Sequence, residues 1–294
     1  TIVNVGTVSL AKDTSVIKYT HNIVAGTTAD VAQYNVNTQY EQARAEAATV
    51  VFANSIASSV AKVQLFLGDT MVGETTSIST TTATFSKADL MNGMVLPMDQ
   101  KALRVVVVTK SIDNKDDRGV KDISDAVDSI DLSNIYGIDS GSPITHATDG
   151  TNSSSFSIVP VDLTISKTAD GQFKLMIAKG TNTDYSGNQL KVLVTSIKLT
   201  KVSMAGVTGV VLTLPNATPI DATTPYTAPT FTVSNYELAN NDAFTLAVTA
   251  DSSAYNSSRN LSLPKDAVTY TVNYNDGVQS YTTTLPDAIT IAQK

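Results

Sequence analysis

The sequence predicts an all-β protein made of two tandem immunoglobulin-like β-sandwich domains with little helix. Three observations predict this fold class. Thr and Val, which suit a pleated and half-buried surface, alternate along much of the chain. The acidic residues are mostly Asp, which suits turns, and Glu occurs only at Glu41, Glu46, Glu74 and Glu237. Strand-like segments also follow one another at the spacing typical of sandwiches.

Alternation is clearest in Ala61–Leu67, where Val63, Leu65 and Leu67 share one face, and Gly68-Asp69 then predicts a turn. The valine run Val105–Val108 predicts a central strand that is covered on both faces. Other strands of the first half are expected at Thr1–Leu10, Val16–Val24, Val31–Val36, Met71–Glu74, Thr80–Phe85 and Ala102–Thr109.

Two segments are ambiguous. Tyr40–Ala48 contains good helix formers but leads directly into the strand-like Thr49–Phe52, so it is expected to be a strand or a single helical turn. In Asp122–Leu132 an apolar residue recurs at helical spacing and Asp residues could cap a helix, so strand and helix both remain open.

A domain boundary is expected near His146–Ser155, a polar stretch typical of a linker, which gives domains 1–155 and 156–294. The two halves of the chain also show a weak sequence similarity to each other. Val8–Lys12 matches Leu163–Lys167, and Gly26-Thr27 matches Gly180-Thr181, at offsets of about 154 to 155 residues, which indicates two related modules. Asn275-Asp276-Gly277 predicts a tight turn between the last two long strands.

Composition excludes several classes of function. A net charge of −7 argues against nucleic-acid binding, which needs a basic face. No apolar run reaches the length of a membrane span. The absence of Cys excludes disulfides and thiolate metal sites. Low charge, abundant Thr and Ser, and a first residue other than Met favour an extracellular or cell-surface protein, with possible glycans on four sequons at Asn152, Asn216, Asn256 and Asn260.

The segment Val63–Phe85 reads VQLFLGDTMVGETTSISTTTATF and is followed by the Val-rich strand Leu96–Thr109. This pattern of strand, Thr-rich turn and "TATF" resembles the β-sandwich repeats of S-layer and extracellular-filament proteins, including those of candidate-phylum bacteria. The opening TVSLAKDTS resembles the lead-in strands of the same proteins. The resemblance covers most of the first module and implies no catalytic residues. The helix-leaning Tyr40–Ala48 departs from the pattern.

No motif indicates catalysis. His21 and His146 are far apart in sequence and have no Cys or second His at ligand spacing, so both are expected to be ordinary turn or surface residues. A carboxylate pair for glycoside hydrolysis can be formed by residues distant in sequence, but the chain lacks Trp for a sugar platform. The sequence therefore predicts a protein that is not an enzyme and needs no cofactor.

Asp113–Gly119 is the densest acidic cluster, and Asp113, Asp116 and Asp117 form a candidate calcium site, since calcium prefers hard oxygen ligands. Lys115 and Arg118 interrupt the charge, and no bidentate Glu follows at helix–loop–helix spacing. A solvated loop without bound calcium is the alternative.

The N-terminal segment Thr1–Leu10 is apolar and uncharged, whereas a soluble monomer normally guards such an edge strand with Lys or Pro. It is predicted to add as a strand to a neighbouring copy through Ile2, Val3, Val5, Val8 and Leu10, or else to pair within its own domain. The leading hypothesis is a structural subunit of an extracellular filament, tube or S-layer that forms a homopolymer. The alternatives are a monomeric adhesin or carbohydrate-binding module, and a viral coat or spike subunit.

Overall fold

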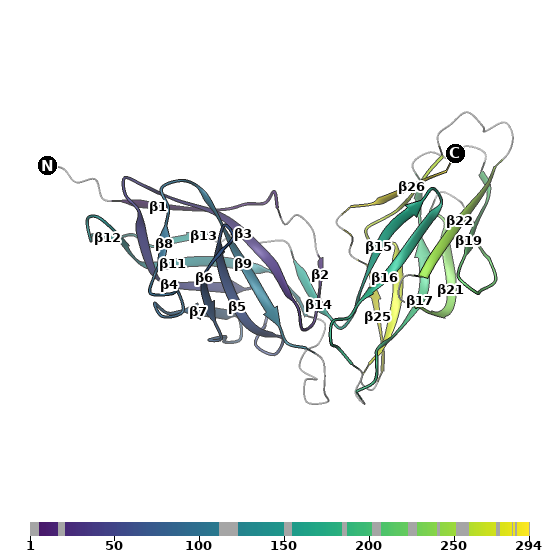
Figure 1. Cartoon of the computed structure of the whole chain (residues 1–294), viewed down its shortest axis with the longest axis horizontal. Coiled ribbons are helices and arrows are strands. Elements are labelled where there is room, and N and C mark those ends of the chain that lie inside the picture. Colours follow the sequence, from purple (N-terminus) through teal and green to yellow (C-terminus); the bar gives the residue numbers. More distant parts are fainter. Residues whose placement is uncertain are drawn as a thin grey trace. The chain divides into compact units, whose positions relative to one another are not determined.

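Figure 1 shows the computed structural model of the chain. It describes residues 6–16, 21–111, 123–149, 155–183, 187–201, 207–222, 228–239, 242–250, 259–274, 277–283, 285 and 287–293. These residues form strands and turns and contain no helix. The prediction of an all-β fold is confirmed.

The described residues up to Val159 form one compact unit, and those from Pro160 onward form a second. The boundary therefore follows Val159 and not residue 155. The reason is the strand β14 (Phe156–Val159), which pairs antiparallel with β10 (Ile123–Asp125) and parallel with β2 (His21–Val24), both of them strands of the first unit.

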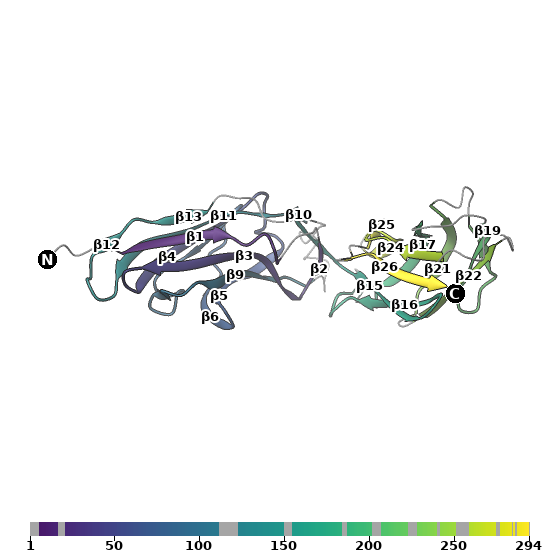
Figure 2. The ribbon, with the colours of Figure 1, turned by 90° about the horizontal axis from the view of Figure 1, so that it is seen from above.

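The first unit has two main sheets. One has the order β1-β3-β9-β5-β6, and the other has the order β12-β11-β4-β7, with β13 paired to β11 and β8 paired to β4. Figure 2 shows these strands from above. Their bounds are β1 (Thr7–Lys12), β3 (Thr28–Gln39), β4 (Ala43–Phe52), β5 (Val60–Leu67), β6 (Thr70–Thr75), β7 (Thr82–Phe85), β8 (Met94–Leu96), β9 (Lys101–Thr109), β11 (Val127–Gly137), β12 (Pro143–Ile144) and β13 (Ala147–Asp149).

The second unit also has two main sheets, with the orders β15-β16-β22-β19-β20 and β21-β17-β24-β25, and a small sheet β18-β23-β26. The strands are β15 (Asp162–Ala169), β16 (Gln172–Ala178), β17 (Lys191–Lys198), β18 (Thr200–Lys201), β19 (Val207–Thr213), β20 (Ile220–Asp221), β21 (Thr230–Glu237), β22 (Asp242–Ala250), β23 (Arg259–Leu263), β24 (Val268–Tyr274), β25 (Gly277–Thr282) and β26 (Ile289–Gln293).

The two units share one strand order. When nine strands of each unit are matched in chain order, both main sheets agree position by position. The matched pairs are β1 with β15, β3 with β16, β4 with β17, β5 with β19, β6 with β20, β7 with β21, β9 with β22, β11 with β24 and β12 with β25. The pair β10–β14 likewise corresponds to β23–β26. The matched segments Val8–Lys12 and Leu163–Lys167 lie in equivalent edge strands, β1 and β15. The Gly match does not extend to equivalent elements, because Gly26 precedes β3 whereas Gly180 follows β16.

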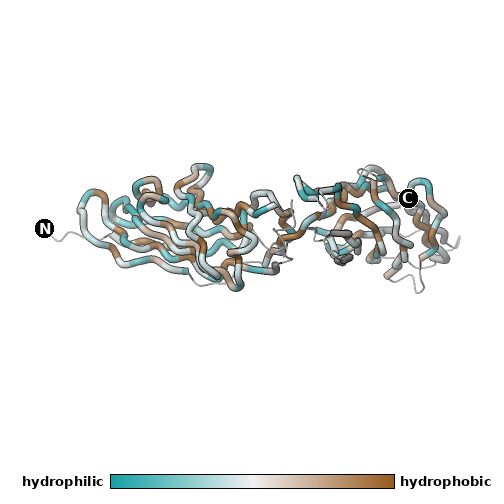
Figure 3. The backbone as a smooth tube through the Cα atoms, turned by 90° about the horizontal axis from the view of Figure 1, so that it is seen from below, coloured by the Kyte–Doolittle hydropathy of each residue, from teal (hydrophilic) through white to brown (hydrophobic). Residues whose placement is uncertain are grey.

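The cores form where the inner faces of the sheets meet. In Figure 3, hydrophobic and hydrophilic positions alternate along the strands. Val63 and Leu65 are fully buried, as their shared face predicts, and Gly68 adopts φ +64° in the turn to β6. Val105, Val106 and Val107 are buried in β9, which lies between β3 and β5, so the prediction of a central strand covered on both faces is confirmed.

Three ambiguous or incorrect expectations are settled by strand pairing. Tyr40–Ala48 contains a turn followed by the start of β4, and no helical turn forms, since Ala43, Ala45 and Ala48 face the core. The described part of Asp122–Leu132 forms β10 and the first half of β11. The linker expected at His146–Ser155 is wrong for Ala147–Asp149, which pairs with β11.

Candidate functional site

The described part of the proposed donor strand pairs within its own unit. Residues Thr7–Lys12 form β1, in which Val8 lies opposite Thr38 and Leu10 lies opposite Val36. Both side chains are half-buried. For these residues, pairing within the same domain, which was the alternative to addition to a neighbouring copy, is what the structure shows. Ile2, Val3 and Val5 lie outside the described residues.

The end of β1 is tied to the opposite sheet by a carboxylate. The Lys12 backbone N–H donates to Asp149 Oδ2 at 2.5 Å, which links β1 to β13. Beneath this link, Tyr34 is fully buried, and its hydroxyl has no hydrogen-bond partner among the described residues. Burial raises the pKa of Tyr34, and the nearby carboxylates of Asp149 and Asp128 raise it further. The phenol therefore stays neutral and plays no part in acid–base chemistry at ordinary pH.

A second carboxylate fastens the turn before β4 to the loop after β11. Glu41 Oε2 accepts the backbone N–H groups of Asp139 and Ser140, both at 3.0 Å, and Glu41 Oε1 accepts the Ser140 hydroxyl at 2.7 Å. The Ser140 hydroxyl and then its backbone N–H hold the pKa of Glu41 below its usual value. Gly137 leaves room for this carboxylate, because a Cβ there would lie 2.2 Å from Glu41 Oε1. The result is a rigid end of the first unit.

Five exposed large apolar side chains, which we call the end patch, lie on neighbouring strands and turns around the exposed Arg44: Tyr40, Val95, Met98, Tyr136 and Ile138. These are five of the eight large apolar side chains that are exposed in the described residues, and each is at least 39% exposed. They come from three separate segments of the chain, so the sequence pattern did not reveal them. Their exposure indicates an interaction surface, because soluble monomers seldom gather large apolar side chains in this way.

The other candidate site residues from the sequence are the three Asp residues of the calcium prediction and the two histidines. Asp113, Asp116 and Asp117 lie outside the described residues, so the calcium site stays a prediction. His21 lies in β2 with its ring centroid 6.4 Å from that of Phe156, and His146 is exposed between β12 and β13. In the part of the chain that is described, no group of three His, Asp or Glu side chains could hold a metal ion.

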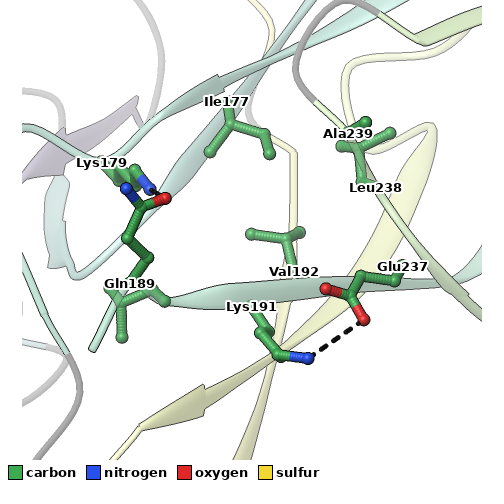
Figure 4. Close-up of a pocket in the computed structure, with 9 residues that line it drawn as sticks. Ile177, Lys179, Gln189, Lys191, Val192, Glu237, Leu238 and Ala239 are labelled. Carbon is green, nitrogen blue, oxygen red and sulfur yellow. Dashed lines mark hydrogen bonds and ion pairs between the residues drawn. The ribbon is translucent and has the colours of Figure 1, made fainter.

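A pocket of about 490 Å³ lies in the second unit, where the connections β16–β17 and β21–β22 cross between the sheets (Figure 4). Its apolar lining is Ile177, Leu190, Val192 and Leu238. Two polar pairs border it: Lys179 Nζ donates to Gln189 Oε1 at 3.0 Å, and Lys191 Nζ lies 3.3 Å from Glu237 Oε2. Neither pair forms a nucleophile with its base. The pocket can therefore accept a small apolar group beside a charged rim.

A shallower cleft of about 660 Å³ adjoins the β19–β20 connection and is lined by Leu214, Pro219, Ile220 and Tyr236 among others. The Tyr236 hydroxyl donates to Asp242 Oδ2 at 2.8 Å, and burial together with this carboxylate raises the pKa of Tyr236. Asn216 is exposed in the neighbouring turn, where a glycan would have access.

The remaining sequons are less informative. The backbone of Asn260 belongs to β23, where it pairs with Ala292. Asn152 and Asn256 lie outside the described residues. Within the described residues, no helix is long and apolar enough to cross a membrane.

Comparison with known proteins gives low similarity. No family model and no curated protein matches the chain. Among solved structures, the Enterococcus faecalis MSCRAMM ACE, which binds its ligands by the collagen hug model, is 9% identical over 93% of both chains with a TM-score of 0.19. The S. aureus collagen adhesin CNA is 10% identical over 99% of this chain and 95% of its own, with a TM-score of 0.17.

A red sea bream transglutaminase is 11% identical over 96% of this chain and 31% of its own, with a TM-score of 0.24. TM-scores this low carry no argument about activity or partners.

Proposed function

We propose that this chain is a structural subunit of an extracellular filament, tube or S-layer, in which copies of the chain join one another by β-strand addition. The observation that carries the proposal is the end patch. It presents five exposed apolar side chains on β8, β11 and the neighbouring turns, at the end of the first unit where β1 begins. An apolar surface of this kind is stable in solution when another molecule covers it.

The composition of the end patch suits a protein partner. Tyr and Met are enriched in the buried centres of protein interfaces, and Lys, Glu, Asp and Ser are depleted there. The patch contains two Tyr, one Met, one Val and one Ile, and the exposed Arg44 lies between Val95 and Tyr136, which also fits because Arg is enriched at interfaces. The extracellular location rests on the low charge, the high Thr and Ser content and the exposed sequon at Asn216.

Negative-stain electron microscopy of the purified chain over a range of concentrations tests the proposal. Filaments, tubes or sheets with a regular repeat are expected. Isolated particles of one size at every concentration would refute assembly by this chain alone.

A surface adhesin or carbohydrate-binding module is the second candidate, and the pocket in Figure 4 favours it. Its buried apolar lining and charged rim could hold a small polar–apolar ligand. Binding to an immobilised glycan and matrix-protein panel tests this role. Binding that is lost in Leu238→Glu, while the fold is kept, would favour the adhesin.

A further inference from the structure

The pocket of the second unit has an equivalent place in the first unit, and there the place is filled. Val8 of β1 pairs with Thr38. Leu163 of β15, which is the match of Val8, pairs with Ile177. Thr38 and Ile177 are therefore equivalent positions of the two units. Ile177 lines the pocket, whereas Thr38 is covered and only 2% exposed.

In the first unit, the connection between β7 and β9 covers this place. The Thr38 backbone N–H donates to the Pro97 carbonyl at 2.9 Å, and the Thr38 hydroxyl donates to the same oxygen at 3.2 Å. Pro97 directly follows β8, and Met94 and Leu96 of that strand are buried. A short apolar segment of the chain therefore closes this end of the first sandwich.

The second unit has a much shorter connection here. The Ala239 N–H donates to Asp242 Oδ2 at 2.8 Å and the Asp242 N–H donates to the Ala239 carbonyl at 3.2 Å, so the chain turns back at once from β21 into β22. The end of β21 replaces part of the pairing that β8 makes, because the Leu238 N–H donates to the Val192 carbonyl at 2.9 Å. In the described part of the second unit no segment corresponds to Pro97, and the pocket of about 490 Å³ occupies that place.

The lining of the pocket suits an apolar side chain on a protein segment. Leu190, Val192 and Leu238 are each at most 5% exposed, so the wall of the pocket is part of the core (Figure 4). An unbranched, flexible Met side chain fits irregular apolar spaces of this kind. In the first unit the segment that closes the equivalent place continues from Pro97 into Met98, which is 50% exposed and belongs to the end patch. The end patch of a second copy thus presents a side chain that the pocket can hold.

The charges around the pocket and around the end patch are complementary. Two basic side chains and one acidic side chain line the pocket: Lys179, Lys191 and Glu237. One basic and two acidic exposed side chains adjoin the end patch: Arg44, Asp99 and Asp139. The two surfaces therefore carry net charges of +1 and −1. Opposite charges favour the pairing of the patch with the pocket, whereas two patches facing each other would bring together like net charges.

On the basis of the proposed function, in which copies of the chain associate, we propose that the end patch of one copy docks on the second unit of a neighbouring copy, with Met98 inserted into the pocket beside Ile177 and Leu238. The patch belongs to the first unit and the pocket belongs to the second, so the contact joins different surfaces. A contact of this heterologous kind repeats from copy to copy and produces an open filament unless it closes into a ring.

The first test changes the inserted side chain. Met98→Asp places a charge against the apolar lining, and the full-length chain that carries it is expected to associate about tenfold or more weakly in sedimentation velocity. Met91→Asp is the matched control, because Met91 is 53% exposed in the same connection between β7 and β9 and lies outside the end patch. Its association should stay unchanged, and thermal melts show that both variants keep the fold. Unchanged association of the Met98→Asp chain, or an equal loss in both variants, would overturn the proposal.

The second test uses the absence of Cys from the chain. Full-length chains carrying Met98→Cys are mixed with chains carrying Ala239→Cys, an exposed position that lines the pocket, and treated with a short bismaleimide. Cross-linked pairs of the two different chains are expected, and Met91→Cys in place of Met98→Cys should give few. A prominent cross-linked pair from chains carrying Met98→Cys alone would mean that the patch docks on a second patch, and would overturn the proposal.

The outcomes separate the contact from the proposed function. If the unmodified chain assembles and the Met98→Asp chain assembles equally well, the contact at the pocket is wrong and the polymer stands. If Leu238→Glu removes binding to a glycan and leaves assembly unchanged, the pocket is a ligand site and the contact is wrong. If the unmodified chain never assembles, the proposed function fails and the contact fails with it.

Discussion

At the residue scale, Glu41 and Tyr34 are two buried polar side chains of the first unit that differ in the hydrogen bonds they make. Glu41 accepts three hydrogen bonds from the loop after β11. The Tyr34 hydroxyl is fully buried and neither accepts nor donates a hydrogen bond within the described part of the chain. A carboxylate that accepts several N–H and O–H groups stabilises the fold, whereas a buried hydroxyl without a partner costs free energy. The two residues should therefore respond to substitution in opposite directions.

Replacement of Glu41 by Gln is expected to lower the melting temperature at pH 7 and to have little effect at pH 3. The pKa of Glu41 is lowered on folding, so the carboxylate stabilises the folded state above its unfolded pKa, and this stabilisation is lost as the pH falls through the folded pKa. Thermal melts followed by circular dichroism measure it. Glu46→Gln in the following strand, β4, removes an exposed ion pair to Lys87 and should matter less. An equal loss for Glu41→Gln at both pH values would contradict the account.

Replacement of Tyr34 by Phe is expected to leave the free energy of unfolding unchanged or to raise it by about 1 kcal/mol, because it removes a buried hydroxyl that has no partner. Tyr270 is the matched control, since it is equally buried and its hydroxyl donates to the Val161 carbonyl at 3.0 Å. Tyr270→Phe should cost about 1–3 kcal/mol. Urea titration of each variant measures both values. A clear loss for Tyr34→Phe would mean that the hydroxyl has a bound partner.

At the element scale, the sequence predicted the strands whose residues alternate clearly, and it failed where long-range pairing decides. The paired faces of β5 and the central position of β9 follow from local patterns. β4 begins in a helix-leaning run because Ala43 and Ala45 have neighbours in both β8 and β11. β13 forms from a polar stretch because β11 is available beside it. The end patch was not predictable either, because its residues become neighbours only after three distant segments have paired.

Replacement of Asp149 by Ala is expected to loosen the end of β1. The carboxylate accepts the Lys12 amide, and bonds to charged acceptors contribute about 1.5–3 kcal/mol. Hydrogen exchange at the Lys12 amide should become faster by about 10- to 100-fold, while exchange in β9 stays slow. Asp30→Ala removes an exposed pair to Arg104 in the same sheet and serves as the control. Unchanged exchange at Lys12 would show that Asp149 does not hold this strand.

At the scale of the whole molecule, the sequence indicated two related modules from a faint match, and the structure extends that match to the order of the main sheets. The boundary between the units lies after Val159, four residues beyond the position predicted from the sequence. The reason is that β14 pairs with β2 of the first unit, which local composition does not show. Each unit has its own buried core. The fragment Pro160–Lys294 is therefore expected to give a β-type circular dichroism spectrum and a cooperative thermal transition. A fragment that stays unfolded would show that the second unit depends on the first.

The central claim is that copies of this chain associate through their own surfaces. Sedimentation velocity of the purified full-length chain, from low to high micromolar concentration, tests it most directly. The account predicts species that grow in mass with concentration in integral steps of the 31.0 kDa chain. A single 31.0 kDa species at every concentration would contradict it.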